Sequence, residues 1–200
     1  MELKTLIQRT RTVRRFQEKE TPPGKVWEEI LEVLKLGGSA RNLQVLKYML
    51  VCNEELRQKI FPLLGWAGYL EQWPGPASGE RPAAYLICLL DTSLSIGTER
   101  EAYCDLGIAT QNFLLAASAQ AIYGCRIASF SEEKIHNLLQ LESHLKPILI
   151  IALGYRAEET VLESVGSDGN IRDWRDNNGV HHIPKRSLTE IMVSEPASSF

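Results

Sequence analysis

The sequence predicts a single α+β domain, and three observations support that prediction. Two continuous apolar runs of strand length, 83–90 and 148–153, have the composition of strands that are buried on both faces. Between them, 99–122 is rich in Ala and Leu, and its apolar residues recur at helical spacing, which predicts a core helix with little free surface. A chain of 200 residues with 44% hydrophobic side chains can bury one core. Because we find no repeat or convincing linker, we expect residues 1–200 to form one domain.

Shorter elements are expected around these three. Helical spacing predicts a helix at 3–7 and another at 26–34, which ends at the glycine pair 37–38. A polar turn at 39–44 then leads into a predicted strand at 46–52. Further expected elements are a helix at 53–60, a long functional lid at 66–82, a turn and extended piece at 123–130, a helix that starts at Ser131, an extended tail at 180–184 and a last segment at 188–193.

The overall charge argues against a broad surface for polyanions. The 22 basic and 25 acidic side chains give a net charge of -3, so any function that depends on positive charge must be local, and we expect no nucleic-acid partner. The chain has no apolar run near the roughly 20 residues that span a bilayer, and its first residues are too polar for a signal peptide. We therefore expect a cytoplasmic protein with no membrane partner.

One local concentration of positive charge stands out. Arg9, Arg11, Arg14 and Arg15 fall within seven residues near the N-terminus. Guanidinium groups bind phosphate and carboxylate oxygens with paired donors, and threonine hydroxyls and backbone amides can complete such a site. The segment therefore suggests a small phosphorylated ligand, although charge runs of this kind also occur as solvated helix faces. A second basic pair, 185–186, lies far along the chain, and spacing alone does not show whether it lies near the first.

Several short segments form a recognisable series along the chain: Arg11-Thr12-Val13-Arg14-Arg15-Phe16, Gly38-Ser39-Ala40-Arg41-Asn42-Leu43-Gln44, Asp105-Leu106-Gly107-Ile108-Ala109-Thr110-Gln111-Asn112, Gly124-Cys125-Arg126-Ile127 and Leu153-Gly154-Tyr155. In this order they resemble motifs of the FMN-dependent nitroreductase-like flavoproteins. Segments typical of one subgroup are Trp66-Ala67-Gly68-Tyr69-Leu70, Trp73-Pro74-Gly75-Pro76 and the tail from Trp174 to Leu188, which includes Gly179-Val180-His181-His182-Ile183-Pro184-Lys185-Arg186-Ser187-Leu188. Each motif is weak alone, but their shared order over almost the whole chain is specific.

This resemblance implies a nitroreductase-like fold, with a mixed β-sheet wrapped by helices, in an intertwined homodimer. It also implies one FMN at each of two sites built from both subunits. The cofactor-binding residues that it implies are Arg11, Thr12 and Arg14 at the phosphate and ribityl chain, Lys185 or Arg186 as added charge, Ser39, Asn42 and Gln44 from the other subunit, and the backbone of Ala128 and Ser129 beside the ring. Ser129 replaces a glycine that is common in the family, and Val45 replaces a proline.

The activity that the resemblance implies is an NAD(P)H-dependent flavin oxidoreductase. Hydride from NAD(P)H would reduce FMN, and an electron-poor small molecule such as a nitro compound or quinone would then accept the electrons in a ping-pong mechanism. We name no catalytic side chain, because the flavin carries the chemistry. The alternative is a non-catalytic flavin-binding or interaction protein on the same scaffold. Reductive dehalogenation and flavin destruction also remain open, because the fold does not select the acceptor.

Some aromatic and histidine residues have both a functional and a structural interpretation. Trp66, Tyr69 and Trp73 would form either an aromatic wall of the substrate cleft or ordinary packing of a loop. His181 and His182 are neighbours whose side chains diverge in an extended chain, and no acidic or cysteine partner is visible at ligand spacing. We therefore expect no metal site.

The central helix and the cysteines are interpreted structurally. Asp105 and Gln111 are expected to support the helix rather than to act as catalysts. The four cysteines form no C-x-x-C pair, so they are expected to be mostly buried thiols, and Cys104 and Cys125 to be buried and inert rather than redox-active; the other two are Cys52 and Cys88.

Overall fold

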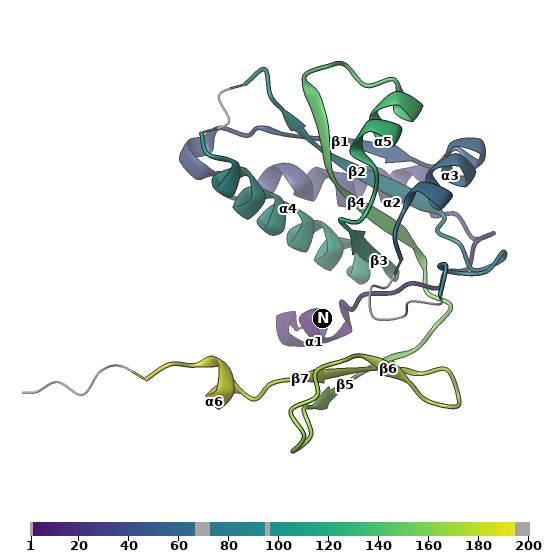
Figure 1. The fold of residues 1–200 in the computed structure, drawn as a ribbon, viewed down its shortest axis with the longest axis vertical. Coiled ribbons are helices and arrows are strands. Elements are labelled where there is room, and N and C mark those ends of the chain that lie inside the picture. Colours follow the sequence, from purple (N-terminus) through teal and green to yellow (C-terminus); the bar gives the residue numbers. More distant parts are fainter. Residues whose placement is uncertain (1, 67–72, 95–96, 195–200) are drawn as a thin grey trace, which may run out of the picture. The chain divides into compact units, whose positions relative to one another are not determined.

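The computed structural model describes residues 2–66, 73–94 and 97–194, and its elements are labelled in Figure 1. The chain divides into two compact units, Met1–Ala157 and Glu158–Phe200. None of the helices in these described ranges combines the length and the apolar character that crossing a membrane requires. The single FMN-binding domain expected over residues 1–200 stays a prediction.

The first unit is built on a four-stranded sheet with the strand order β1-β2-β4-β3. Its strands are β1 (Leu46–Val51), β2 (Ala84–Asp91), β3 (Ile122–Ile127) and β4 (Leu145–Tyr155). All three pairs are antiparallel. The two apolar runs of the sequence are the central strands β2 and β4, which confirms their assignment as buried strands. β4 extends beyond the run at both ends, because Lys146 and Pro147 also pair with β2, and Gly154 and Tyr155 pair with β3.

Helices cover both faces of this sheet (Figure 1). On one face lie α2 (Gly24–Leu31), the 3₁₀ turn η1 (Glu32–Leu36) and α4 (Glu99–Ala119); on the other lie α3 (Glu54–Ile60) and α5 (Glu132–Leu139). Leu86 packs with Phe113 of α4, whereas its neighbour Ile87 packs in the core that contains Ile60 and Ile135. The alternation of side chains along β2 therefore supplies both hydrophobic cores.

The remaining elements of the first unit are short. They are α1 (Leu3–Arg9), η2 (Ala40–Asn42) and η3 (Phe61–Leu63). The predicted helix at 26–34 is an α-helix that tightens into η1. The predicted strand at 46–52 and helix at 53–60 correspond to β1 and α3, and Asn53 caps α3 by accepting a hydrogen bond from the Leu56 amide.

The boundary between α4 and β3 differs from the sequence prediction. A capping box of Thr98 and Glu101 starts α4. The helix ends at Ala119 rather than at 122, because Ala121 has a φ of 59°, in the left-handed region that terminates helices. Ile122 then begins β3, so most of 123–130, expected as a turn with an extended piece, is an edge strand.

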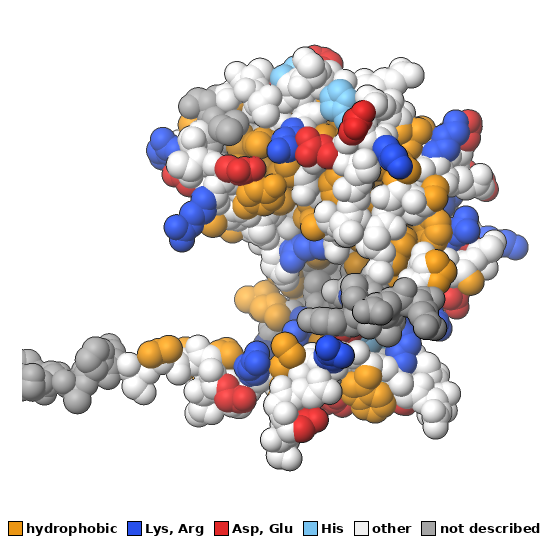
Figure 2. Space-filling view, in the orientation of Figure 1, with side chains coloured by type: hydrophobic (Ala, Val, Ile, Leu, Met, Phe, Trp, Pro, Cys, Tyr) orange, Lys and Arg blue, Asp and Glu red, His pale blue; other side chains and the backbone are white. Residues whose placement is uncertain are grey.

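The second unit contains a three-stranded sheet of β5 (Thr160–Ser164), β6 (Trp174–Arg175) and β7 (His181–Lys185), in the order β5-β7-β6. β5 and β7 are parallel, whereas β6 and β7 are antiparallel. The short helix α6 (Leu188–Ile191) follows. Apolar side chains of α6 and of the residues after it are exposed, as Figure 2 shows.

Both histidines of β7 have acidic partners. His181 Nε2 lies 2.6 Å from Asp173 Oδ2, and His182 Nδ1 lies 2.9 Å from Glu163 Oε2. The Trp174 ring stacks on His182 with 4.0 Å between ring centroids. Sequence spacing does not show these partners, because sheet pairing brings them in from β5 and from the loop before β6. Burial lowers the pKa of His181 despite Asp173, which favours the neutral ring.

Candidate functional site

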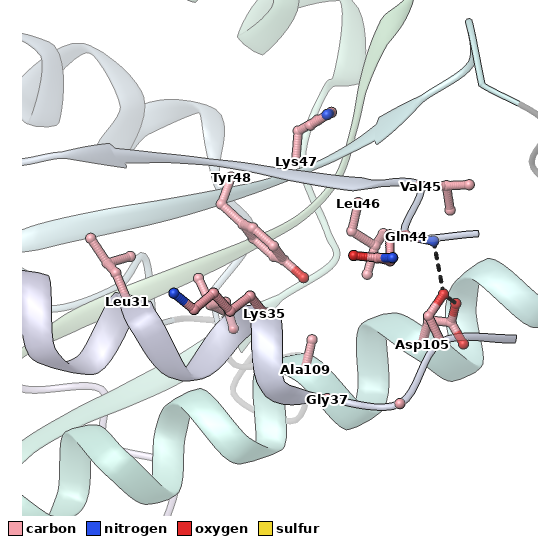
Figure 3. Close-up of a pocket in the computed structure, with 13 residues that line it drawn as sticks. Leu31, Lys35, Gly37, Gln44, Val45, Leu46, Lys47, Tyr48, Asp105 and Ala109 are labelled. Atoms are coloured by element: carbon pink, nitrogen blue, oxygen red, sulfur yellow. Dashed lines mark hydrogen bonds between the residues drawn. The ribbon is translucent and has the colours of Figure 1, made fainter. Parts of the chain in front are cut away.

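Two cavities in the first unit contain residues that the sequence analysis selected. The smaller one, here called the arginine cavity, has a volume of about 160 Å³ and is lined by Thr10, Arg11, Thr12, Arg14, Gln111, Leu114, Tyr123, Gly124 and Arg126. The larger one, here called the loop cavity, has a volume of about 480 Å³ and is lined by Leu31, Leu34, Lys35, Gly37, Gly38, Ser39, Gln44, Val45, Leu46, Lys47, Tyr48, Asp105 and Ala109 (Figure 3). They share no lining residue.

The arginine cavity forms where the segment after α1 meets the edge strand β3. Thr12 and Gly124 form a parallel bridge, and the Val13 amide donates to the Gly124 carbonyl over 3.2 Å. Val13 and Phe16 are fully buried, and they anchor the segment in the core. Gly124 also allows the close packing of β3 against β4, because a Cβ there would lie 2.9 Å from the Ala152 carbonyl oxygen.

The sequence cluster of four arginines separates into two pairs. Arg11 and Arg14 line the cavity, whereas Arg9 and Arg15 do not. Arg9 donates to the Tyr123 hydroxyl over 3.4 Å, and Arg15 Nε lies 3.5 Å from Glu80. The two arginines that the sequence singled out, Arg11 and Arg14, are therefore the two that line the cavity.

Arg126 and Gln111 are among the polar residues of this cavity that were missed as ligand-binding candidates. Arg126 projects from β3 and donates from Nη2 to Gln111 Oε1 of α4 over 3.2 Å. The sequence signal was present, because Arg126 stands alone as a charged residue in an otherwise apolar strand. Arg126 was missed because a turn was expected in 123–130. Only the alternation of side chains along a strand places Arg126 on the same side as Gly124.

The electrostatics of the arginine cavity favour an anion. None of the described residues that line it is acidic. Burial lowers the pKa of Arg11, and partial desolvation lowers the pKa of Arg126 even though much of its side chain is exposed. Guanidinium groups stay charged under such conditions, so the cavity concentrates positive charge in a partly desolvated space. This contrasts with the face visible in Figure 2, where acidic and basic side chains are interspersed.

The loop cavity depends on Asp105 of α4. Ser39 Oγ donates to Asp105 Oδ2 over 2.7 Å, and the Ala40 amide donates to Asp105 Oδ1 over 3.0 Å. The Gln44 amide in turn donates to Ser39 Oγ over 3.0 Å (Figure 3). Asp105 therefore has the structural role expected of it, since it ties the loop at 39–44 to the central helix.

The same loop has an unusual backbone. Arg41, Asn42 and Gln44 have φ values of 52°, 56° and 51°, a left-handed conformation that L-residues adopt rarely. The Gln44 side chain donates to Asn42 Oδ1 over 3.1 Å, and both side chains are exposed. Gln44 and Ser39 line the loop cavity, whereas Asn42 does not. The Asp105 contacts hold this conformation in place.

Tyr48 adds a polar group to the loop cavity. Its side chain projects from β1 toward the cavity in Figure 3. Burial raises the pKa of this phenol, so Tyr48 keeps its proton. The cavity thus combines a neutral hydroxyl and an amide with apolar walls from Leu31 and Leu34.

The other expected cofactor residues line neither cavity. Ala128 and Ser129 are exposed residues directly after β3, and the Ser129 carbonyl accepts a hydrogen bond from the Gly65 amide over 2.7 Å. Lys185 and Arg186 are exposed residues at and after the end of β7 in the second unit. Their cofactor roles stay predictions.

The aromatic and cysteine candidates have mixed outcomes. Trp66 is buried and makes an edge contact with Trp73, with 6.4 Å between ring centroids. Tyr69, the third aromatic residue of the expected lid, lies outside the described residues. Cys125 is buried as expected. The expectation for Cys104 was wrong: it is exposed, because it lies on the side of α4 that faces away from the sheet.

The family model described as "Nitroreductase family" matches residues 7–155. The chain belongs to the nitroreductase family. A provisionally named NADH dehydrogenase/NAD(P)H nitroreductase of Methanothermobacter thermautotrophicus is 27% identical over 162 residues, which cover 79% of each protein.

Solved structures show the same fold. A nitroreductase family protein of Clostridium novyi NT matches with a TM-score of 0.66 and 16% identity, over 96% of this chain and 100% of that one. An FMN-dependent nitroreductase of Clostridium difficile R20291 matches with a TM-score of 0.62 and 17% identity, over 77% and 87% of the two chains. The expected family and α+β fold are therefore confirmed. The four-stranded sheet is entirely antiparallel, and parallel pairing occurs at the Thr12–Gly124 bridge and between β5 and β7.

Replacement of Asp105 tests the support of the loop cavity in this nitroreductase-family protein. Asp105→Ala leaves the Ser39 hydroxyl and the Ala40 amide without their acceptor, so we expect a loss of about 1–3 kcal/mol in the free energy of unfolding. Hydrogen exchange should also become faster at the Ala40 and Gln44 amides. Glu99→Ala, on an exposed position of the same helix, is the control. Unchanged protection of both amides in Asp105→Ala would contradict this role.

Proposed function

We propose that this protein is an FMN-dependent oxidoreductase that takes hydride from NAD(P)H and reduces an electron-poor small molecule by a ping-pong mechanism. The observation that carries the proposal is the arginine cavity, in a chain whose family is the nitroreductase family. The relatives' names point the same way, since one solved neighbour is called an FMN-dependent nitroreductase and the archaeal relative an NAD(P)H nitroreductase.

The arginine cavity fits the phosphate of FMN. Arg11 and Arg14 offer guanidinium donors, and the exposed Thr12 adds a hydroxyl group. Arg11 Nε is buried without a hydrogen-bond partner among the described residues. A bound phosphate oxygen would supply both the missing acceptor and the countercharge. The added charge of Lys185 or Arg186 stays a proposal that rests on the family resemblance alone.

The loop cavity supports a site assembled from two subunits. Within one chain, the phosphate-binding candidates and the pair Ser39 and Gln44 line separate cavities. A second copy would bring its Ser39, Asn42 and Gln44 to the flavin held by the first copy's arginine cavity. Hydroxyl and amide groups suit this position, because the edge of a flavin ring presents both donors and acceptors.

The outer side of α4 is a suitable surface for the homodimer. Tyr103 and Ile108 are 46% and 45% exposed, and Leu36 beside the helix is 71% exposed. The expectation that α4 leaves little free surface was therefore wrong for the single chain. Association of two copies through this side would bury the exposed apolar groups.

The chemistry would come from the cofactor, and the chain would supply binding, orientation and access. When bound, FMN supplies two-electron transfer between NAD(P)H and the acceptor. The backbone at Ala128 and Ser129 would lie beside the ring, and Tyr48, which stays protonated, would offer a neutral donor in the loop cavity. We assign no catalytic acid or base.

The direct test is anaerobic reduction of the purified, FMN-loaded protein. We expect the flavin absorbance to bleach on mixing with NADH or NADPH and to return when a nitro compound or a quinone is added. Flavin that binds but is bleached by neither nucleotide would favour the alternative, a non-catalytic flavin-binding protein. Protein that leaves the spectrum of added FMN unchanged would contradict both. A wider acceptor screen on the reduced protein would then identify the substrate class.

Replacement of Arg11 tests the phosphate contact. Arg11→Ala removes a charge-assisted hydrogen-bond donor worth about 1.5–3 kcal/mol, so we expect the Kd for FMN to rise about 10- to 100-fold. Arg9→Ala is the matched control from the same segment, because Arg9 does not line the cavity. Equal FMN affinity in Arg11→Ala and the wild type, measured by flavin fluorescence, would reject the assigned role.

The oligomeric state tests the two-subunit site. Sedimentation should give twice the chain mass of 22.5 kDa, and Ile108→Lys should shift the protein toward the monomer by placing a charge in the interface. Leu94→Lys, at an exposed apolar residue outside α4, is the control and should stay dimeric. A wild-type monomer that still binds FMN with full affinity would rule out the shared site.

A further inference from the structure

The arginine cavity contains a third guanidinium that comes from a different element. Arg11 and Arg14 come from the segment after α1, whereas Arg126 comes from β3. The bridge between Thr12 and Gly124 aligns the segment with the strand. Because residues two apart on a strand face the same side, Arg126 lies on the side of β3 that carries Gly124, which also lines the cavity.

The hydrogen-bond partner of Arg126 is neutral. Its Nη2 donates to the side-chain oxygen of Gln111 over 3.2 Å. Other arginines of this unit face carboxylates: Arg41 pairs with Glu101 at 2.7 Å, and Arg15 lies near Glu80. An amide orients a guanidinium without neutralising it, so the charge of Arg126 stays available to a ligand.

Three guanidinium groups around a cavity of about 160 Å³ repel one another, and none of the described lining residues offsets them with a negative charge. A phosphate monoester carries close to two negative charges at neutral pH and offers three terminal oxygens to the paired donors of arginine, so it suits a cavity lined by several guanidinium groups.

We propose that Arg126, oriented by Gln111, is a third phosphate-binding side chain of the arginine cavity. This inference rests on the proposed FMN-binding function, and it adds a residue from β3 to the expected set. Gln111 is a positioning residue, because it acts on the ligand through Arg126. Replacing it with the isosteric glutamate would supply an internal counterion and compete with the phosphate.

The test compares FMN with riboflavin, which has the same ring and ribityl chain but no phosphate. For Arg126→Gln we expect the Kd for FMN to rise about 10- to 100-fold, while the Kd for riboflavin stays within about threefold of the wild type. Gln111→Glu should weaken FMN binding in the same selective way. Lys134→Gln removes one positive charge from an exposed position of α5, on the other face of the sheet and outside the cavity, and should change neither Kd.

The outcomes separate this inference from the function on which it rests. If the wild-type protein binds neither FMN nor riboflavin, both the proposed function and the inference are contradicted. Normal binding by the wild type, with an unchanged Kd for FMN in Arg126→Gln, would overturn the inference alone. Equal weakening of FMN and riboflavin in that variant would also overturn it, because the contact would then be to the ring or ribityl chain, or the fold itself would be altered.

Discussion

The candidate site depends above all on one backbone contact, the parallel bridge between Thr12 and Gly124. The bridge places the arginine segment beside an edge strand whose other side packs in a hydrophobic core. Residue 124 has no side chain, and a Cβ there would collide with the Ala152 carbonyl of the neighbouring strand β4, so the glycine lets β3 pack closely at the position where the bridge forms. Buried Val13 and Phe16 hold the segment there. Positive charge is thereby fixed on rigid elements and not left on a free loop, which favours a preorganised anion site.

The central helix α4 connects the two cavities. Asp105, in its first half, ties the strained loop of the loop cavity, and Gln111, six residues later, orients Arg126 in the arginine cavity. Six residues of helix span about 9 Å, so one rigid element sets the spacing of both supports. Asp105 and Gln111, which both belong to the motif at 105–112, therefore support groups that come from other elements.

The sequence predicted the family, the α+β class, the two central strands and the pair of arginines that face a cavity. These features rest on local patterns: apolar runs, helical spacing and the order of motifs. The missed features depend mostly on contacts between residues that are far apart in the sequence. Ala121 ends α4 through a left-handed φ, which the sequence does not predict for an alanine. Arg126 faces the cavity only because β3 pairs with β4, and Ser39 meets Asp105 across 66 positions of sequence. The histidines of β7 meet their acidic partners through sheet pairing in the same way.

The Thr12–Gly124 bridge also has a consequence for the order of assembly. Its two residues are separated by 112 positions, so the arginine segment cannot reach its place until α4 and β3 have been synthesised and β3 has joined the sheet. Closing so long a segment is entropically costly, and contacts of this range form slowly. We therefore expect the N-terminal residues, although they emerge first from the ribosome, to reach their place only after β3 has formed, and the arginine cavity to be completed with them.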